Sequence, residues 1–159
     1  MLYSQLHTCY TRKINSVDRS NDSQHADSER VDSFTNNVFI GNPACVVRLN
    51  KWLPDDILLN IAKENALAET ALFVEQGESF HLRWITPDIE IDLCGHATLA
   101  TAHVIKTCLN YSQKCIFFKT KTGTLKVNIA NNIYFMDFPS RVATSYPLAE
   151  EIKLSLNIQ

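Results

Sequence analysis

The pattern of apolar and polar positions predicts short strands through most of the chain. In residues 79–86 (SFHLRWIT), Phe80, Leu82 and Trp84 alternate with polar side chains, which is the two-residue period of a half-buried strand. A turn at Gly77 separates this segment from residues 70–75 (TALFVE). We therefore expect these two segments to form a β-hairpin.

Six further segments have the composition of strands and are bounded by turn residues. They are residues 31–34 (VDSF), 42–49 (NPACVVRL), 90–93 (EIDL), 114–121 (KCIFFKTK), 124–130 (TLKVNIA) and 132–138 (NIYFMDF). Turns are expected at Gly41, at Thr122-Gly123 and at Asn131-Asn132. The chain therefore contains far more strand than helix.

Three helices are expected between and after these strands. Pro54 at a first helical position, with Asp55 and Asp56 in the first turn, predicts a helix that runs to about Asn65. Residues 97–109 (ATLATAHVIKTCL) carry apolar side chains all round the helical wheel, which is typical of a helix buried at the centre of a sheet. Residues 147–159 have leucine or isoleucine at four-residue spacing and predict a terminal helix.

A buried helix wrapped by mainly antiparallel strands, with a second helix outside, is an α+β architecture. We expect one domain, because 159 residues with 45% hydrophobic and 20% charged residues are typical of a single soluble globular unit. The expected sheet can curl into a half-barrel around the central helix.

Charge and cysteine usage limit the partners and the compartment. The 15 basic and 17 acidic residues give a net charge of -2, which argues against nucleic acid as a partner. The longest weakly polar stretch, residues 95–109, is too short to cross a bilayer, so no membrane partner is expected. Five cysteines without a paired spacing predict neither a disulfide framework nor a zinc site. A reducing, cytoplasmic location fits best.

The first 30 residues are expected to be a disordered extension. Between Asp18 and Arg30 the only apolar residue is Ala26, so this segment offers little to a core, and order is expected to begin near Val31. No secretory signal is expected, because the first 30 residues contain no continuous apolar segment. A mitochondrial presequence is a weaker alternative, since residues 1–17 contain two basic residues and no acidic one.

Glu69 is a candidate acid and base. It follows the first predicted helix and precedes an apolar strand, a loop position from which a carboxylate can face a pocket and transfer protons. The alternative is a capping or solvated glutamate, as most charged loop residues are.

Cys94, Gly95 and His96 are candidates because they lie where a strand gives way to the buried helix. The unpaired N–H groups of a helix start can bind a carboxylate, and Gly95 would let a ligand approach the backbone. The helix end is expected to lower the pKa of Cys94, which would make it a nucleophile or a proton carrier. A buried structural thiol remains the alternative. His96 and His103, seven residues apart, lack a third ligand and so predict no metal site.

Further positions are weaker candidates. Asp32 and Asn42-Pro43 flank the loop TNNVFIGNP, which is rich in turn residues and could close over a pocket. Asp92 could orient or cap the start of the central helix. An ordinary loop and an ordinary cap are the alternatives.

Several blocks, in order, resemble the phenazine-biosynthesis isomerase-like family, whose fold is shared with diaminopimelate epimerase. They are VDSFTNNVFIGNPACVV, IAKENALAETALFV, LRWITPDIEIDLCGHATLATAHVI, FKTKTGTLKV and MDFP. The resemblance covers about residues 31–139, which would form the first of two lobes, each a central helix wrapped by strands. Residues 140–159 would then be a linker and the start of a truncated second lobe.

The resemblance implies a role for each candidate. Glu69 matches the glutamate that moves a proton on a dihydro-hydroxyanthranilate without any cofactor. Gly95 and His96 match the turn that presents amides and the histidine to the substrate, and Asn42 matches a GNP motif near the same cleft. In the epimerase relatives a cysteine near this turn carries a proton, so Cys94 could share the work with Glu69.

The leading hypothesis is an isomerase-like protein that transfers a proton on a small carboxylate substrate without a cofactor. The alternative is a non-catalytic binding or interaction module that retains only the first lobe. Hydrolysis by Cys94 with His96 as base is a weaker third hypothesis, since residues two apart at a helix start are expected to point in different directions. An open cleft wall would expose apolar surface, so a homodimer is the expected assembly.

Overall fold

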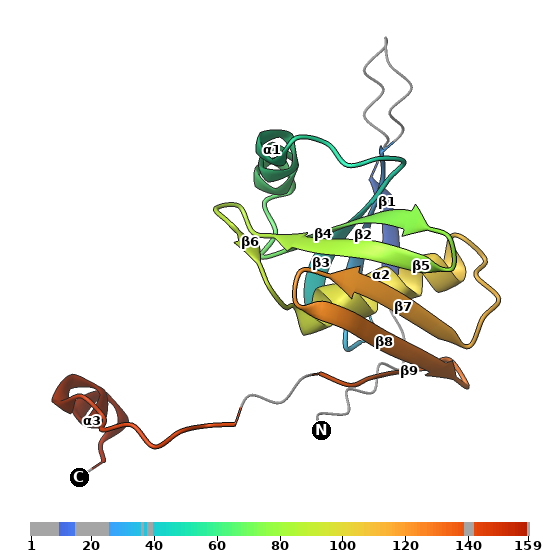
Figure 1. The fold of residues 1–159 in the computed structure, drawn as a ribbon. Coiled ribbons are helices and arrows are strands. Elements are labelled where there is room, and N and C mark those ends of the chain that lie inside the picture. Colours follow the sequence, from blue (N-terminus) through green and yellow to red (C-terminus); the bar gives the residue numbers. More distant parts are fainter. Residues whose placement is uncertain (1–9, 15–25, 36, 38–39, 139–141, 159) are drawn as a thin grey trace.

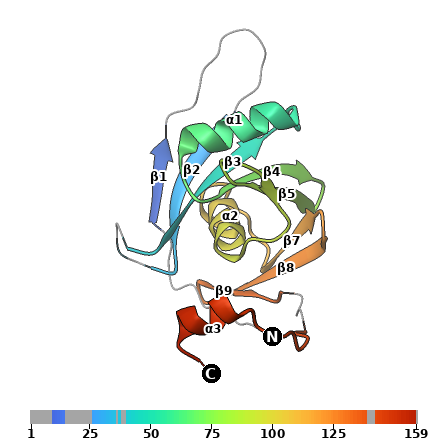
Figure 2. The ribbon, with the colours of Figure 1, turned by 90° about the vertical axis from the view of Figure 1, so that its left-hand side faces the viewer.

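A single nine-stranded sheet curls around one helix in the computed structural model, which describes residues 10–14, 26–35, 37, 40–138 and 142–158 (Figures 1 and 2). Within these residues the elements are β1 (Tyr10–Ile14), β2 (Ala26–Ser33), β3 (Asn42–Leu49), α1 (Asp55–Asn65), β4 (Thr70–Gln76), β5 (Ser79–Ile85), β6 (Glu90–Ile91), α2 (Gly95–Thr107), β7 (Cys115–Thr120), β8 (Gly123–Ala130), β9 (Ile133–Met136) and α3 (Glu150–Leu156). The predicted hairpin is confirmed as β4 and β5, and the first helix starts one residue after Pro54.

The strand order of the sheet is β1-β2-β3-β4-β5-β7-β8-β9, with the short β6 paired to β5. Two neighbouring pairs, β3–β4 and β5–β7, are parallel, and each is connected through a helix. The other pairs are antiparallel. The α+β prediction of mainly antiparallel strands around a central helix is therefore confirmed.

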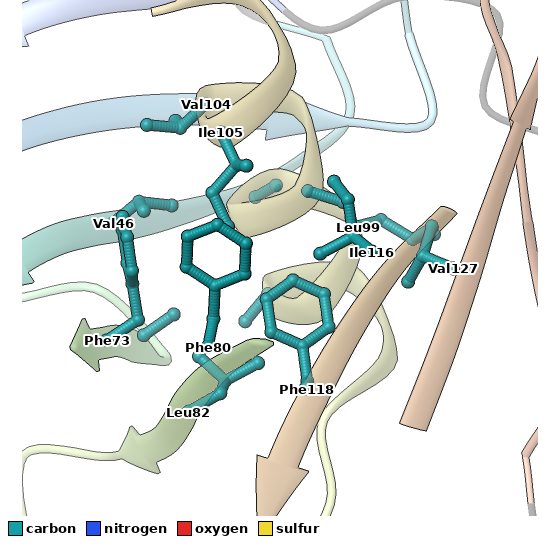
Figure 3. Close-up of a cluster of buried hydrophobic side chains, with 14 of the residues drawn as sticks. Val46, Phe73, Phe80, Leu82, Leu99, Val104, Ile105, Ile116, Phe118 and Val127 are labelled. Carbon is teal, nitrogen blue, oxygen red and sulfur yellow. The ribbon is translucent and has the colours of Figure 1, made fainter. Parts of the chain in front are cut away.

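Helix α2 fills the inside of the curled sheet (Figure 2). Ala97, Ala100 and Ala102 have no exposed surface, and their small side chains let the strands approach the helix closely. The hydroxyl of Thr101 donates to the carbonyl of Ala97 at 2.7 Å, so this buried polar group has its partner. Phe73, Phe80, Leu82, Ile116, Phe118 and Val127 of the surrounding strands pack against Leu99, Val104 and Ile105 of the helix (Figure 3).

Helix α1 covers the outer face of the sheet. Its buried residues Leu58 and Ala62 pack against Cys45, Val47 and Leu72 of strands β3 and β4. Strands β3 and β4 are thus covered by α2 on one face and by α1 on the other, and this explains why their sequences are almost continuously apolar.

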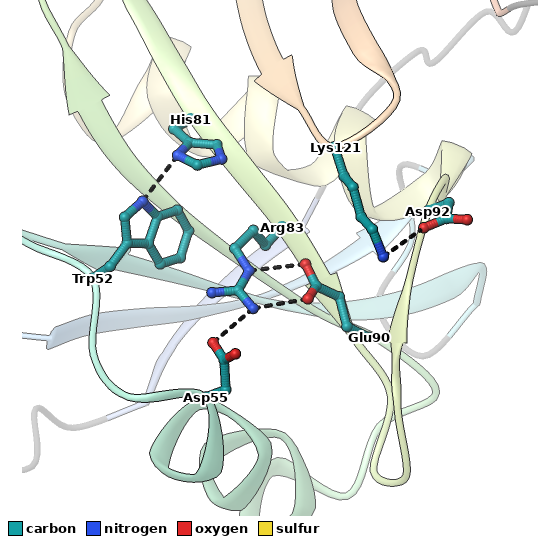
Figure 4. A network of polar contacts seen from close by, with 7 residues as sticks. All are labelled: Trp52, Asp55, His81, Arg83, Glu90, Asp92 and Lys121. Atoms are coloured by element: carbon teal, nitrogen blue, oxygen red, sulfur yellow. Dashed lines mark hydrogen bonds and ion pairs between the residues drawn. The ribbon is translucent and has the colours of Figure 1, made fainter.

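A polar network fastens α1 to β5 and β6 on the outside of the sheet (Figure 4). Arg83 donates two hydrogen bonds to the carboxylate of Glu90, each 2.8 Å long, and one of 2.9 Å to Asp55. The indole of Trp52 lies 5.2 Å from the guanidinium and donates its N–H to Nδ1 of His81. Arg83 therefore links β5 to β6 through a bidentate ion pair with Glu90 and to α1 through Asp55.

The expected start of order near Val31 is wrong. Strand β2 begins at Ala26, five residues earlier, and β1 pairs with it in antiparallel register from Tyr10 to Ile14. The polar sequence before Val31 did not predict a strand, because Glu29 occupies an inward position where an apolar residue was expected. Glu29 is 6% exposed. The remainder of the predicted extension, residues 1–9 and 15–25, lies outside the described residues.

The terminal helix is confirmed as α3, but it has no buried residue (Figure 1). The apolar side chains on and beside it are exposed: Leu148, Ile152, Leu154, Leu156 and Ile158. Among the described helices, none has the length and apolar composition that crossing a membrane requires.

Candidate active site

Glu69 lies immediately before β4, in the short segment that follows α1. Helix α1 ends at a left-handed residue, Ala66 with φ of 50°, which turns the chain back toward the sheet. The carbonyl of Glu69 accepts the backbone N–H of Cys45 in β3 at 3.3 Å. Its side chain is 21% exposed. The predicted loop glutamate is thus held by the sheet and does not extend freely into solvent.

Cys94 is the N-cap residue of α2. Its backbone is extended, with φ of −142° and ψ of 116°, and the helix proper starts at Gly95. The Cys94 carbonyl accepts the N–H of Thr98 at 3.2 Å and the Thr98 hydroxyl at 2.5 Å. These contacts fix the turn that connects β6 to the buried helix.

Three side chains of the two segments meet at this turn. Nδ1 of His96 lies 3.4 Å from Sγ of Cys94, and Nε2 of the same ring lies 3.2 Å from Oε2 of Glu69. The expectation that Cys94 and His96 point in different directions is therefore wrong. It assumed helical geometry for both residues, whereas the extended backbone of Cys94 lets its side chain fold back over the first turn.

The contact between Glu69 and His96 is close but bent. Oε2 of Glu69 and Nε2 of His96 are both buried, and neither has a well-aligned hydrogen bond to any group in the part of the chain that the structure describes. A buried carboxylate oxygen and a buried ring nitrogen without aligned partners are costly to maintain. Such atoms are expected where a ligand or a proton completes the site.

Burial sets the protonation of the histidine. It lowers the pKa of His96 below its usual 6.5, while the Glu69 charge and the carbonyl of Pro43 act in the opposite direction. His96 is therefore neutral at pH 7 and offers one N–H and one free lone pair.

The pKa of Cys94 is shifted in the direction opposite to the prediction. Burial raises it to about 11, the N–H groups of Ala97 and His96 lower it in part, and the negative charge of Glu69 raises it further. Burial outweighs the lowering of the pKa that was expected from the helix end, because Cys94 is only 7% exposed. Cys94 is thus a protonated thiol at neutral pH.

Gly95 is the first residue of α2, and the ring of Phe138 covers its Cα. A Cβ at this position would lie 3.4 Å from the nearest ring atom of Phe138. The partly buried ring of Phe138 therefore lies where a ligand was expected to approach the backbone of Gly95.

Asn42 starts β3 opposite Ser33, and its side chain is exposed. The next residue, Pro43, presents its carbonyl to His96. Ser33 lies behind the site, where its hydroxyl donates to the His96 carbonyl at 2.9 Å. The structure thus brings Glu69, Cys94 and His96 together and places Asn42 beside them on the adjoining strand.

The sequence did not identify Ser33 or the carbonyl of Pro43 as parts of the site, and it gave Asp92 a role that the structure does not support. Ser33 and Pro43 gave no chemical signal, and only the pairing of β2 with β3 places them beside His96. Asp92 does not cap α2; its carboxylate lies 3.4 Å from Nζ of Lys121 (Figure 4).

Comparison with known proteins identifies the family to which this fold belongs. The model of the phenazine biosynthesis-like protein family matches residues 31–156, which extends beyond the expected limit of residue 139. An uncharacterized isomerase of Pseudomonas aeruginosa is 39% identical over 129 residues, which are 81% of this chain and 49% of the relative. The chain thus spans about half the length of this curated relative.

Solved structures show the same relationship. A phenazine biosynthesis protein of the PhzF family from Enterococcus faecalis superposes with a TM-score of 0.74 at 43% identity, over 82% of this chain and 50% of the other. A predicted epimerase from Pseudomonas aeruginosa, with a TM-score of 0.57 at 18% identity over 65% of this chain and 39% of the other, shares the fold.

Proposed function

The chain belongs to the phenazine biosynthesis-like protein family, and we propose that it transfers a proton on a small carboxylate substrate, with Glu69 as acid and base. Its relatives include proteins named as isomerases, so an isomerisation that moves one proton between two carbon atoms is the reaction class. A glutamate can take up and return the same proton, so the proposed reaction needs no cofactor.

One observation carries this proposal: the carboxylate of Glu69 is fixed 3.2 Å from a neutral imidazole at the edge of the core. The hydrogen bond from the Cys45 N–H to the Glu69 carbonyl holds the backbone of Glu69, and its side chain lies within ion-pair distance of the His96 ring. Together these contacts keep the carboxylate at the edge of the core. A fixed position is what a proton transfer requires.

The start of α2 supports carboxylate binding. The helix has 13 residues, and the positive end of its dipole lies at this turn, where the N–H groups of His96 and Ala97 now donate to the Cys94 sulfur. We assign substrate binding to Gly95 and His96 of this turn, and to Asn42 at its side. Phe138 would have to move when a ligand reaches the backbone of Gly95.

Cys94 fits a second proton carrier better than a nucleophile. Its contact with His96 removes the geometric objection to a cysteine hydrolase. A thiol with a pKa of about 11, however, is protonated at neutral pH and is a poor nucleophile. It can still donate a proton to a carbon atom that faces Glu69, so the proposed roles are base for Glu69 and acid for Cys94.

Assembly and location are proposals as well. The exposed apolar side chains of α3 and its flanks favour self-association, and we propose a homodimer. Cys45, Cys94, Cys108 and Cys115 are free thiols, which favours a reducing compartment such as the cytoplasm.

The alternative is a module that binds a carboxylate without catalysis. It shares the helix start with the isomerase proposal but does not need the Glu69 carboxylate. The two functions are distinguished by incubating the chain in heavy water with dihydroaromatic and amino-acid carboxylates and following deuterium incorporation by NMR.

The isomerase proposal expects incorporation by the wild type and its loss in Glu69→Gln. The matched control is Glu64→Gln, an exposed residue of α1 that should leave the exchange rate unchanged. Binding of a carboxylate with no exchange would instead support the binding module. Equal exchange rates in wild type and Glu69→Gln would contradict the role of Glu69.

A further inference from the structure

We propose that Glu69, Cys94 and His96 form a zinc-binding site, and that a bound zinc ion excludes proton transfer by Glu69. The inference uses the side chains of the candidate active site but does not depend on the isomerase activity. It rests on their geometry, on two buried atoms and on the chemistry of the three donors.

The geometry is close to that of a tetrahedral site. One ligand atom from each of the three residues lies within 4.8 Å of the other two. Zinc binds sulfur, nitrogen and oxygen at about 2.0–2.3 Å, so tetrahedral ligand atoms lie about 3.3–3.8 Å apart. The largest separation therefore has to close by about 1 Å, and the imidazole has to turn, because Sγ of Cys94 lies beside Nδ1 and Oε2 of Glu69 beside Nε2 of the same ring.

Two buried atoms of the group lack an aligned hydrogen bond to the residues described. They are Oε2 of Glu69 and Nε2 of His96, which lie 3.2 Å apart. A cation between them would accept a lone pair from each and remove the cost of leaving them unsatisfied.

The donor set favours zinc over the abundant hard cations. A thiolate, an imidazole and a carboxylate are typical zinc ligands, whereas magnesium and calcium prefer oxygen. Binding converts the thiol to a thiolate: Cys94–SH and Zn²⁺ give Cys94–S–Zn⁺ and one released proton. Three protein ligands leave the fourth position for water or for the carboxylate of a ligand.

The spacing of the cysteines does not predict this site, because Cys94 is the one cysteine of the group. The two histidines of α2, His96 and His103, do not share it: His103 is bonded to the hydroxyl of Tyr134 at 3.1 Å. The third ligand comes from Glu69, 25 to 27 residues earlier in the chain, and only the pairing of β3 with β4 brings it to the start of α2.

Occupancy would regulate the proposed chemistry. A carboxylate bound to zinc shares its negative charge with the ion and is a much weaker base. A zinc ion would therefore compete with catalysis, and a chelator would restore it.

The test is to titrate the complete, untagged chain with Co²⁺ as a spectroscopic substitute for zinc, and then to displace it with Zn²⁺. A thiolate ligand gives an intense sulfur-to-cobalt charge-transfer band in the near ultraviolet, and a four-coordinate ion gives strong visible bands. We expect both, with saturation at one ion per chain. Binding without the sulfur band, or no saturable binding, would overturn the proposal, and neither readout requires substrate.

Variants locate the site. Cys94→Ser should abolish the sulfur band, and Glu69→Gln and His96→Gln should each weaken Zn²⁺ binding by more than the roughly 10–100-fold expected for loss of an outer partner. The matched controls Cys108→Ser, Glu64→Gln and His103→Gln should bind as the wild type does. A sulfur band that persists in Cys94→Ser, or that disappears in Cys108→Ser, would contradict the assignment even if all variants fold.

Discussion

The backbone N–H of Cys45 donates to the carbonyl of Glu69 at 3.3 Å, so the catalytic candidate is attached to the sheet one residue before its own strand begins. The same strand β3 carries Pro43, whose carbonyl faces His96. Both sides of the Glu69–His96 contact are therefore positioned by β3. The site depends on the correct register of this strand more than on any single side chain.

Gly41, which precedes β3, should be sensitive for this reason. It has φ of +116°, and a Cβ there would lie 2.5 Å from the carbonyl oxygen of Ser33. We expect Gly41→Ala to reduce the free energy of unfolding by about 3 kcal/mol, the sum of backbone strain and overpacking. Urea denaturation measures the difference.

The matched control is Gly77→Ala. Gly77 has φ of +61° in the β4–β5 turn, and a Cβ there would meet nothing within 4 Å. Only backbone strain of about 1 kcal/mol is expected. Equal losses in both variants would show that the contact with Ser33 is unimportant.

Two truncations test the corrected start of the fold. Deletion of residues 1–14 removes the edge strand β1 and should lower the melting temperature by only a few degrees. Deletion of residues 1–30 also removes Ala26–Arg30, which pair with residues 45–49 of β3, and should prevent cooperative unfolding. Circular dichroism melts compare them. A cooperative melt of the shorter chain at the wild-type temperature would mean that β2 contributes nothing before Val31.

Arg83 should contribute to stability through Glu90 and not through Asp55. The side chains of Arg83 and Glu90 are 17% and 28% exposed, whereas that of Asp55 is 83% exposed. Arg83→Met leaves the Glu90 carboxylate without its two hydrogen bonds and should cost about 1–3 kcal/mol. Asp55→Asn should change stability by less than about 0.5 kcal/mol. A larger loss in Asp55→Asn than in Arg83→Met, in chemical denaturation, would reverse this ranking.

Stability should fall as the pH decreases through about 6.5. Burial lowers the pKa of His81, His96 and His103 below the usual histidine value of 6.5. In the unfolded chain the pKa of each ring returns to about 6.5. The unfolded state therefore binds more protons near and below pH 6.5, and protonation favours unfolding. The full contribution of the neutral rings is present above pH 6.5 and is lost on acidification. Urea midpoints between pH 7.5 and 5.5 provide the measurement.

His81 offers a control for the pH effect. It accepts the Trp52 N–H at its Nδ1 and lies near Arg83, and a proton on that nitrogen would break the bond and add a second positive charge. His81→Gln should therefore show a shallower pH dependence than the wild type. A midpoint that does not change with pH in the wild type would contradict the assignment of neutral histidines.

Local patterns predicted the elements well. The two-residue period of Phe80, Leu82 and Trp84 found β5, and apolar residues all round residues 97–109 located the buried helix. The polar start of β2 was missed because strands were recognised by apolar inward positions, and Glu29 occupies one of them.

The site could be predicted only in part. Residue type and position identified Glu69 and Cys94–His96, but the distances between them depend on strand pairing that no local pattern contains. The pKa of Cys94 was predicted in the wrong direction because the helix end was weighed without the burial that opposes it. Similarly, helical-wheel reasoning separated Cys94 from His96, although Cys94 precedes the helix and is extended.

The place of α2 inside the curled sheet has a consequence for synthesis on the ribosome. Strands β1 to β5 are synthesised before Leu99, Val104 and Ile105, so the inner faces of these strands cannot pack against α2 until the helix has been made. Strand β7, which pairs with β5, is synthesised later still. Closure of the half-barrel therefore has to wait for α2 and β7, and until then the apolar inner faces of the earlier strands are open to aggregation.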